Sequence, residues 1–308
     1  MDLALITAKQ VIVLFGLIFA GYLCTKTGVI KLEYKKAFSD LLLYLVVPIM
    51  VIHSYMTDFD PSVLSNLLLA FGLSFVLILM GLIITMVMTF KMQGKNVPIF
   101  RFACIFSNAA YMGFPLIEAL FGQEGLLYAS GFVTVFNLLL WTIGYTMLNP
   151  NVQKNHIVHT ICTTPVLIAV VAGLVIYLGR IPIPDIIKQP LSFISNMNTP
   201  LSMLITGIMI ANSNLKQLIC NRNLGYLILL RMLLIPLVCF AVFMALGLNG
   251  MVVAVVMLLE ACPSAAITSV FAVQYNYDEE LAAGAVVFTT LLSIIMLPLC
   301  AFLLTIIM

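Results

Sequence analysis

Residues 106–122, FSNAAYMGFPLIEALFG, interrupt a part of the chain that is otherwise apolar enough to cross a lipid bilayer. The segment contains a Ser107-Asn108 pair followed by Gly113 and Pro115. Proline removes a backbone donor and disfavours a helical conformation at the residue before it. In hydrocarbon each unpaired backbone group costs several kcal/mol, so an interrupted helix persists only inside protein or beside a water-filled cavity. The segment therefore predicts a broken membrane helix in the protein interior.

The composition of the whole chain indicates a polytopic membrane protein. Of 308 residues, 63% are hydrophobic and 8% are charged, whereas a soluble domain carries about 25% charged residues. The mean hydropathy is +1.18. The charges lie between apolar runs that approach the ~20 residues needed for a spanning helix. The seven cysteines have no paired spacing, so we expect small buried side chains and no disulfides.

Hydropathy predicts an all-α membrane protein with ten transmembrane helices. The predicted spans are residues 10–25, 37–57, 63–90, 98–121, 125–148, 164–183, 190–212, 223–247, 251–275 and 281–307. The linkers between them, such as residues 149–159, are too short to form a soluble domain.

The placement of lysine and arginine predicts the orientation of the chain in the cell membrane. If both termini face outside, ten of the 14 Lys and Arg residues fall in cytoplasmic linkers, three lie outside, and Arg231 lies within a span. We therefore expect both termini on the outer side of a multi-pass protein of the cell membrane.

The two halves of the chain resemble each other at an offset of 152 positions. The matched positions are Ala20-Gly21 with Ala172-Gly173, Pro48 with Pro200, and Asn108 with Glu260. Because five spans per half is an odd number, the second half must enter from the opposite face. This predicts two inverted five-helix repeats with crossed broken helices 4 and 9, an architecture common among secondary transporters.

The second predicted break lies in LLEACPSAAITSV, residues 258–270. Where two broken helices cross, the freed N–H groups can hold an anion and the freed carbonyls a cation. The expected substrate-binding residues are Asn108, Gly113, Pro115, Pro263, Ser264, Asn198 and Thr199. The expected hinge or crossing positions are Pro48, Pro200, Pro115 and Pro263. Alternatively, each proline only kinks its helix, and the polar residues before Pro200 form interhelical hydrogen bonds.

Glu260 is a single acid about ten residues into its predicted span. An ionised carboxylate there costs at least ~2.5 kcal/mol on insertion scales, and such groups usually serve ion or proton pathways. We therefore expect Glu260 to bind or release a coupling cation. Arg231, in the preceding span, offers the alternative of a structural ion pair.

The sequence lacks the motifs of several enzyme classes. It has no GxxxxGK[ST] phosphate loop, no HExxH metal motif and no arrangement of an intramembrane hydrolase. His53 is expected at the end of a span, and His156 and His159 in a loop. We therefore expect no enzyme, no cofactor, no dedicated metal site and no nucleic-acid partner.

Four segments of the chain resemble the auxin efflux carrier family, whose bacterial members include malate permeases and related carboxylate carriers. They are GYLCTKTGVIKLEYKKAFSDLLLYLVVPIMVIHSY (residues 21–55), SNAAYMGFPLIEALFG (107–122), NTPLSMLITGIMIA (198–211) and EACPSAAITSVFAVQYNYDEELAAGAVVFTTLLSIIMLPL (260–299). The resemblance runs from the first predicted span to the last. The long central cytoplasmic loop of some plant members is absent, and residues 149–159 stand in its place.

The resemblance implies a fold related to bile acid/sodium symporters, with a scaffold that often dimerises and a moving transport domain. Scaffold parts would be residues 1–60 and 151–213, and transport parts residues 61–150 and 214–308. In sodium-coupled relatives a Ser-Asn pair on the first crossing helix and an acid on the second bind sodium. Since Ser107, Asn108 and Glu260 match these types, the resemblance implies Na⁺ or H⁺ as the coupling ion, and a homodimer through the scaffold helices.

The residues and the resemblance together predict a secondary active transporter of small organic anions, namely malate-like dicarboxylates or related carboxylates. Transport would follow elevator-type alternating access and be coupled to H⁺ or Na⁺. Two other classes stay open at this point. One is an uncoupled anion channel or facilitator, and the other is a membrane receptor that does not transport.

Overall fold

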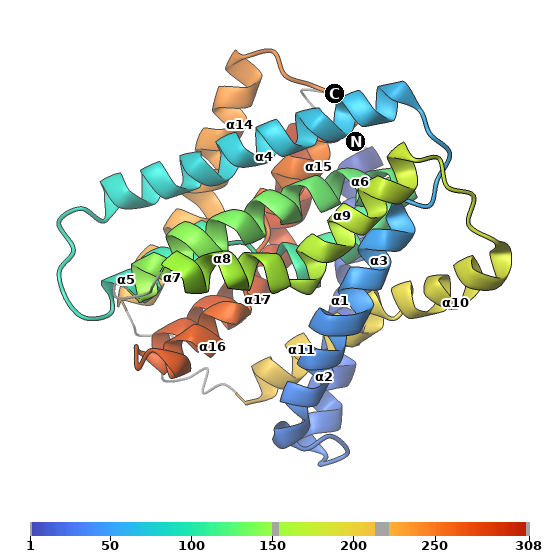
Figure 1. Ribbon diagram of the computed structural model, residues 1–308. Coiled ribbons are helices and arrows are strands. Elements are labelled where there is room, and N and C mark those ends of the chain that lie inside the picture. The colour runs from blue at the N-terminus through green and yellow to red at the C-terminus, as the bar shows by residue number, and fades with distance from the viewer. Residues whose placement is uncertain (1, 150–153, 213–221, 306–308) are drawn as a thin grey trace.

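The computed structural model describes residues 2–149, 154–212 and 222–305, whose regular structure is helical apart from one isolated β-bridge (Figure 1). The α-helices of the first half are α1 (Asp2–Lys26), α2 (Lys35–Leu41), α3 (Val47–Ser54), α4 (Pro61–Met88), α5 (Val97–Ile105), α6 (Phe114–Leu139) and α7 (Tyr145–Leu148). Those of the second half are α8 (Lys154–Thr163), α9 (Pro165–Leu178), α10 (Asp185–Ser195), α11 (Asn198–Ala211), α13 (Arg222–Ile228), α14 (Ile235–Ala245), α15 (Met251–Glu260), α16 (Ile267–Gln274) and α17 (Glu279–Leu304). The expected domain boundaries at residues 150/151 and 213/214 lie outside the described residues.

Shorter helical turns connect several of these helices. They are the 3₁₀ turn η1 (Leu32–Tyr34) and the π-helical turns η2 (Leu42–Val46), η3 (Ala109–Gly113), η4 (Leu140–Gly144) and η5 (Leu229–Leu234). Pro48, Pro115 and Pro236 each lie two residues after a π-helical turn. A proline ring clashes with the carbonyl four residues earlier, so the preceding turn widens. Pro200 instead lies in the first turn of α11, where its missing N–H leaves the helix intact.

The described helices make the chain a multi-pass membrane protein. Seven helical stretches, four of which join several of these elements end to end, are long and apolar enough to cross a membrane, and there are eight if the bent pair of α8 and α9 counts as one span. The expected number of ten is not confirmed, because two predicted spans run on as one apolar stretch, Ala109–Leu148, bent at Gly122. The predicted span 251–275 is divided between the short helices α15 and α16. The expected loop at residues 149–159 is wrong in its second part, since α8 begins at Lys154.

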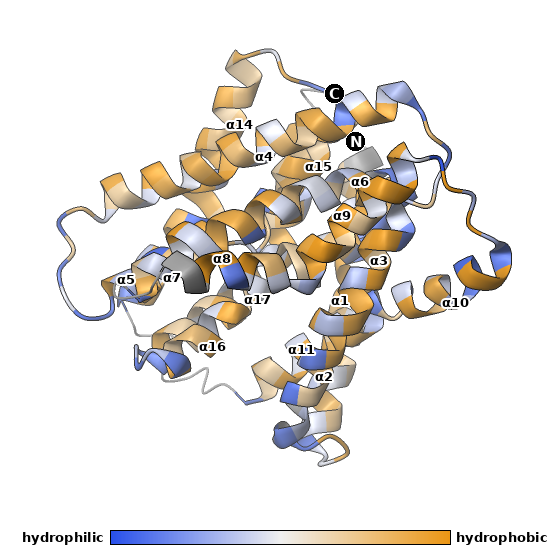
Figure 2. Cartoon of the chain, in the orientation of Figure 1, coloured by the Kyte–Doolittle hydropathy of each residue, from blue (hydrophilic) through white to orange (hydrophobic). Residues whose placement is uncertain are grey.

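The outer helices present apolar surface to the surroundings. Figure 2 shows hydrophobic residues along the length of α4 and α9, with hydrophilic residues concentrated in the connections. Leu68 on α4 exposes 63% of its surface and Val171 on α9 exposes 62%. Such surface is suited to contact with lipid chains and not with water.

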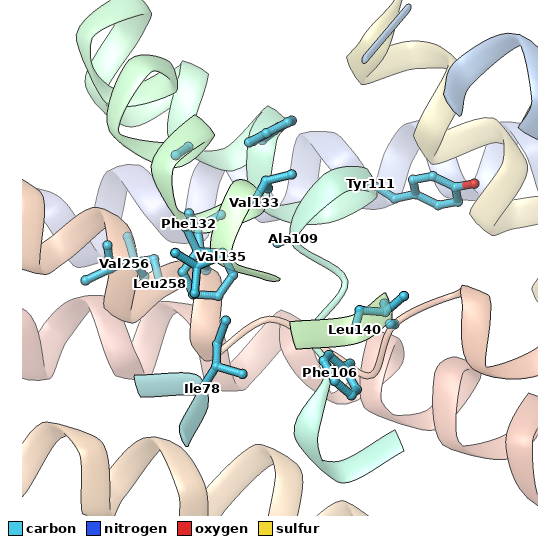
Figure 3. Packing of buried hydrophobic residues seen from close by; sticks show 14 of the residues in the cluster. Ile78, Phe106, Ala109, Tyr111, Phe132, Val133, Val135, Leu140, Val256 and Leu258 are labelled. Atoms are coloured by element: carbon cyan, nitrogen blue, oxygen red, sulfur yellow. The ribbon is translucent and has the colours of Figure 1, made fainter. Parts of the chain in front are cut away.

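The interior is built around α15 and α6. Residues 252–260 of α15 are all buried, although the helix has only ten residues. In Figure 3, Val256 and Leu258 of α15 lie on the side of Phe132 of α6, a helix that α15 contacts. Because α15 is surrounded by protein, it can end in the interior without exposing its last carbonyls to lipid.

Two pairs of elements approach closely through glycine. A Cβ atom on Gly21 of α1 would overlap the backbone of α11, and one on Gly207 of α11 would overlap the backbone of α1. Gly173 of α9 makes a similar approach to the ring of Tyr55, directly after α3. Small residues allow such contact between membrane helices, so these glycines fix how α1 meets α11 and how α9 meets α3.

Candidate functional site

The two interrupted stretches of the chain meet in the interior. Two backbone hydrogen bonds join them. The N–H of Asn108 donates to the carbonyl of Pro263 (N···O 2.7 Å), and the N–H of Ala265 donates to the carbonyl of Phe106 (2.8 Å). Together they form an antiparallel bridge between Ser107 and Ser264. Ser107 exposes 2% of its surface and Ser264 none. Each segment therefore satisfies backbone groups of the other where neither continues its helix. The two expected breaks are present and face each other, and we call this region the crossing.

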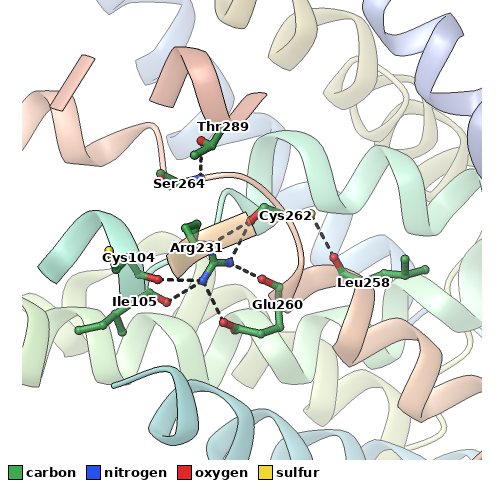
Figure 4. Close-up of polar contacts among 8 residues, drawn as sticks. All are labelled: Cys104, Ile105, Arg231, Leu258, Glu260, Cys262, Ser264 and Thr289. Atoms are coloured by element: carbon green, nitrogen blue, oxygen red, sulfur yellow. Dashed lines mark hydrogen bonds and ion pairs between the residues drawn. The ribbon is translucent and has the colours of Figure 1, made fainter. Parts of the chain in front are cut away.

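Arg231, in η5, lies at the crossing and is fully buried (Figure 4). Its Nη1 atom donates to the carbonyls of Cys104 (3.1 Å) and Ile105 (3.2 Å), at the end of α5. Its Nε and Nη2 atoms donate to the carbonyl of Cys262 at 3.1 and 2.9 Å, and Nη2 also donates to the carbonyl of Glu260. Nη1 further pairs with Oε1 of the Glu260 carboxylate at 2.9 Å.

The chemistry of helix ends explains these contacts. The last carbonyls of a helix have no partner within it and carry a partial negative charge. A guanidinium group has five N–H donors in a fixed fork, so one arginine can satisfy several carbonyls and a carboxylate together. Because α5 and α15 end at the same guanidinium, Arg231 links both of them to its own helix in one hydrogen-bonded unit.

Glu260 was predicted to bind a coupling cation, with an ion pair to Arg231 as the alternative. The ion pair is what the structure contains, with Glu260 only 1% exposed. The pairing across the crossing places Asn108 opposite Pro263. The second carboxylate oxygen, Oε2, is buried and has no hydrogen-bond partner among the described residues. A coupling role for Glu260 stays a prediction.

The helices that begin after the two breaks present backbone N–H donors, whereas the helices that end before the breaks present carbonyl acceptors. η3 starts at Ala109 and continues into α6, and α16 starts at Ile267. The first N–H groups of a helix have no partner within it and attract negative charge. Nearby, the hydroxyl groups of Ser107, Ser264 and Thr268 are buried without a hydrogen-bond partner in the described parts of the chain. We call the first N–H groups of η3 and α16, together with these three hydroxyls, the N–H ends of the crossing. The carbonyls around Arg231, at the ends of α5 and α15, are its carbonyl ends.

The other predicted site residues lie around the first break. A Cβ atom on Gly113 would overlap the Leu259 side chain, so glycine allows η3 to approach α15. Pro115 is buried in the first turn of α6. Asn198 is fully buried at the start of α11, a helix that contacts η3, and neither of its amide atoms has a partner among the described residues. Thr199, beside it, is half-buried.

Two contacts at the site were not predicted. The backbone N–H of Ser264 donates to the hydroxyl of Thr289 on α17 at 3.0 Å. Tyr111 of η3 extends away from the other labelled side chains in Figure 3 and interacts with Ser39 of α2. A threonine pair within the apolar last span was the only available signal for Thr289. For Tyr111 the sequence offered none, because a tyrosine in a membrane helix has many roles.

Comparisons with known proteins place the chain in a family. Residues 6–162 and 158–301 match the family described as membrane transport protein. An uncharacterized transporter of Methanocaldococcus jannaschii is 21% identical over 303 residues, covering 96% of this chain and 98% of that protein. An uncharacterized transporter of Methanothermobacter thermautotrophicus is 26% identical over 200 residues, covering 64% and 65%. A probable auxin efflux carrier component 1b of Oryza sativa subsp. japonica is 29% identical over 129 residues, covering 42% of this chain and 23% of the plant protein. The chain therefore belongs to the membrane transport protein family of the auxin efflux carrier type.

Proposed function

We propose that the protein is a secondary active transporter of small organic anions, with malate-like dicarboxylates or related carboxylates as its substrates. The observation that carries this proposal is the set of N–H ends at the crossing. Two helix N-termini lie there, together with the buried hydroxyls of Ser107, Ser264 and Thr268, which have no hydrogen-bond partner among the described residues. N–H groups at a helix N-terminus bind carboxylates without a cationic side chain. Arg231 is already paired with Glu260, so the substrate is held by dipoles and hydroxyls.

Access to this site would alternate by an elevator movement of the crossing helices. The hydrogen bonds of Arg231 support this part of the proposal, because they tie α5 and α15 to the helix that carries η5. A unit held in this way can move without separating the two breaks. Burial of Ser107 and Ser264 indicates that the observed conformation is closed to solvent at the crossing, so a movement is needed for substrate to enter.

Ten spans in two inverted five-helix repeats are the architecture that we propose. The bridge between the breaks is antiparallel, as expected for equivalent segments that enter from opposite faces. The glycines matched at the 152-residue offset also make corresponding contacts. Gly21 in the first predicted span approaches α11 in the seventh, and Gly173 in the sixth approaches Tyr55, at the end of the second. Pro48 and Pro200 would flank the moving helices on the scaffold side.

Coupling to H⁺ or Na⁺, a homodimer formed through the scaffold helices, and a position in the cell membrane with both termini outside complete the proposal. Ser107, Asn108 and Glu260 are the proposed coupling residues. The Oε2 atom of Glu260 has no partner in the described parts of the chain, which favours H⁺, because a proton needs one free carboxylate oxygen whereas Na⁺ needs several oxygen ligands.

Uptake by reconstituted protein tests this function. Purified protein in liposomes should take up labelled malate, or another small carboxylate of a panel, with saturation kinetics under an imposed pH gradient or sodium gradient. In Glu260→Gln, uptake should no longer follow the imposed gradient, whereas Glu118→Gln, which removes a half-buried carboxylate on α6, should behave as wild type. Gradient-driven uptake that persists in Glu260→Gln would remove this residue from the coupling mechanism.

The same liposomes separate the two other classes. Ionic currents faster than carrier turnover would indicate a channel. Saturable binding of a carboxylate without any uptake into sealed vesicles would indicate a receptor. Either result contradicts secondary transport.

A further inference from the structure

The carbonyl ends of the crossing form a cage of oxygen atoms around the guanidinium group of Arg231. The five oxygen atoms are the carbonyls of Cys104, Ile105, Glu260 and Cys262 and the Oε1 atom of Glu260. Four come from helix ends and one from a carboxylate, and the residues that supply them are buried. Carbonyl and carboxylate oxygens are the ligands that hard cations such as Na⁺ prefer.

The cage requires positive charge whether or not an arginine is present. Two helix C-termini direct partial negative charge to one point, and Glu260 adds a full charge there. In broken-helix transporters unwound carbonyls and half-helix ends coordinate a mobile cation. Here the positive charge belongs to a side chain that is covalently part of η5. A guanidinium group keeps its charge at every accessible pH, so this cation does not leave the cage.

We propose that Arg231 is a tethered cation that permanently fills the cation position of the crossing and makes the protein independent of sodium. Its five N–H donors replace the ligand contacts that a bound sodium ion would make with the cage. Removal of the side chain should therefore create a site for a free cation, with guanidinium preferred because it matches the fork that was removed. The claim about sodium in transport depends on the proposed function, whereas the claim about the cage does not.

Thermal unfolding in detergent tests the cage without any substrate. Arg231→Ala should unfold at a lower temperature than wild type, and millimolar guanidinium chloride should restore part of the loss in a saturable manner, because a ligand that binds only the folded state stabilises it. Sodium chloride should restore less, and choline chloride nothing. Wild type should respond to none of these salts at the same concentrations.

Two control variants define what the rescue means. Arg101→Ala removes another arginine that donates to a carbonyl, that of Thr89, from a position outside the crossing, and guanidinium should not stabilise it. In Arg231→Ala with Glu260→Gln, loss of the cage charge should weaken the rescue at least tenfold in guanidinium concentration. Failure of every cation to stabilise Arg231→Ala, or equal rescue of Arg101→Ala, would overturn the proposal.

Wild-type protein provides a second test if Arg231→Ala does not fold. Carboxylate uptake and unfolding temperature should be unchanged when sodium is replaced by choline, and a tenfold fall in uptake or a sodium-specific rise in unfolding temperature would contradict the tethered cation. If wild type transports no carboxylate at all, the proposed function fails, while the unfolding measurements still decide the cage.

Discussion

The carbonyl ends and the N–H ends of the crossing differ in how their polar groups are satisfied. At the carbonyl ends, one guanidinium group pairs with four backbone carbonyls and a carboxylate oxygen. At the N–H ends, the hydroxyls of Ser107, Ser264 and Thr268 are equally buried and have no partner among the described residues. The two breaks thus produce one side where the polar groups are paired with Arg231, the filled side, and one side where the hydroxyls have no partner among the described residues, the unused side.

This difference suits the two sides of the crossing to different roles. A buried polar group without a partner is unfavourable by about 1–3 kcal/mol, so such groups persist where another requirement retains them. The filled side ties the ends of α5 and α15 to η5, and under the proposed function the unused side would receive the exchanging ligand. Polarity alone does not locate a binding site in this interior. Whether a buried polar group already has a hydrogen-bond partner is more informative about where a ligand could bind.

Replacement of Arg231 should have the largest effect, because it empties the filled side. Arg231→Leu leaves a lone buried carboxylate and four unpaired carbonyls, so we expect a loss of about 3–5 kcal/mol in the free energy of unfolding. Glu260→Leu should be less harmful, since the guanidinium keeps its carbonyl partners. Unfolding titrations in mixed detergent measure both variants.

The order of these two variants is the decisive outcome. The double replacement Arg231→Leu with Glu260→Leu should be more stable than Arg231→Leu alone, because no isolated charge remains. If Glu260→Leu were the more damaging single change, the ion pair and not the carbonyl contacts would hold the crossing, and the contrast between its two sides would weaken.

A methyl group at Gly113 should have the next largest effect. Gly113→Ala forces the Leu259 side chain to move in a packed interior, with an expected loss of about 1–3 kcal/mol in unfolding free energy. Gly72→Ala on α4 is the matched control, because a Cβ atom there meets nothing within 4 Å. If both variants unfold alike, the approach of η3 to α15 does not depend on glycine.

The sequence was sufficient for the breaks themselves and insufficient for how they are joined. Pro263 lies within the second break and acts through local backbone chemistry, so its effect could be predicted without a structure. Pro115 instead lies in the first turn of α6, after the first break at residues 106–108, and the helix continues through it. The partners of Arg231 could not be predicted, because four of them are backbone carbonyls, which have no signature in the sequence. The register of the crossing, with Asn108 opposite Pro263, is set by packing between distant segments. The sequence also did not show that residues 109–148 form one continuous helical stretch. The two predicted spans in this region are separated only by a bend, which is a single backbone conformation at Gly122 (φ 62°).

Serine hydroxyls at the N–H ends should be needed for transport and not for stability. Ser107→Ala and Ser264→Ala remove buried hydroxyls that have no partner among the described residues, so neither variant should lose stability, and its unfolding free energy should rise by up to about 1–3 kcal/mol. Uptake of the carboxylate should fall about 2–10-fold if each hydroxyl donates one hydrogen bond to it. Ser74→Ala on α4 is the matched control, since this buried hydroxyl donates to Ala70 of its own helix. Unchanged uptake in both bridge variants would contradict the assignment of the N–H ends to substrate.

A helix end outside the membrane should show the smallest effect. The Asp60 carboxylate, at the start of α4, accepts hydrogen bonds from the hydroxyl and the backbone N–H of Ser62, both at 2.7 Å. These bonds, the hydroxyl first, hold the pKa of Asp60 below its usual value. The unfolded carboxyl has a pKa of about 3.9. The stabilisation is therefore complete above that pH and is lost as the pH falls through the lower folded-state pKa.

The Asp60→Ala variant should thus have a slightly lower unfolding temperature than wild type at pH 7, and the difference should shrink below about pH 4. Asp60→Asn keeps an acceptor at this position without a titrating group, so its own unfolding should not show this dependence on pH. The contrast with Arg231 follows from solvent. Water can replace the contacts of Asp60 on the exposed end of α4, whereas the buried carbonyls of α5 and α15 have no such substitute. A loss at Asp60 as large as that of Arg231→Leu would show that helix ends in water and in the interior are satisfied at similar strength, which the burial of Arg231 argues against.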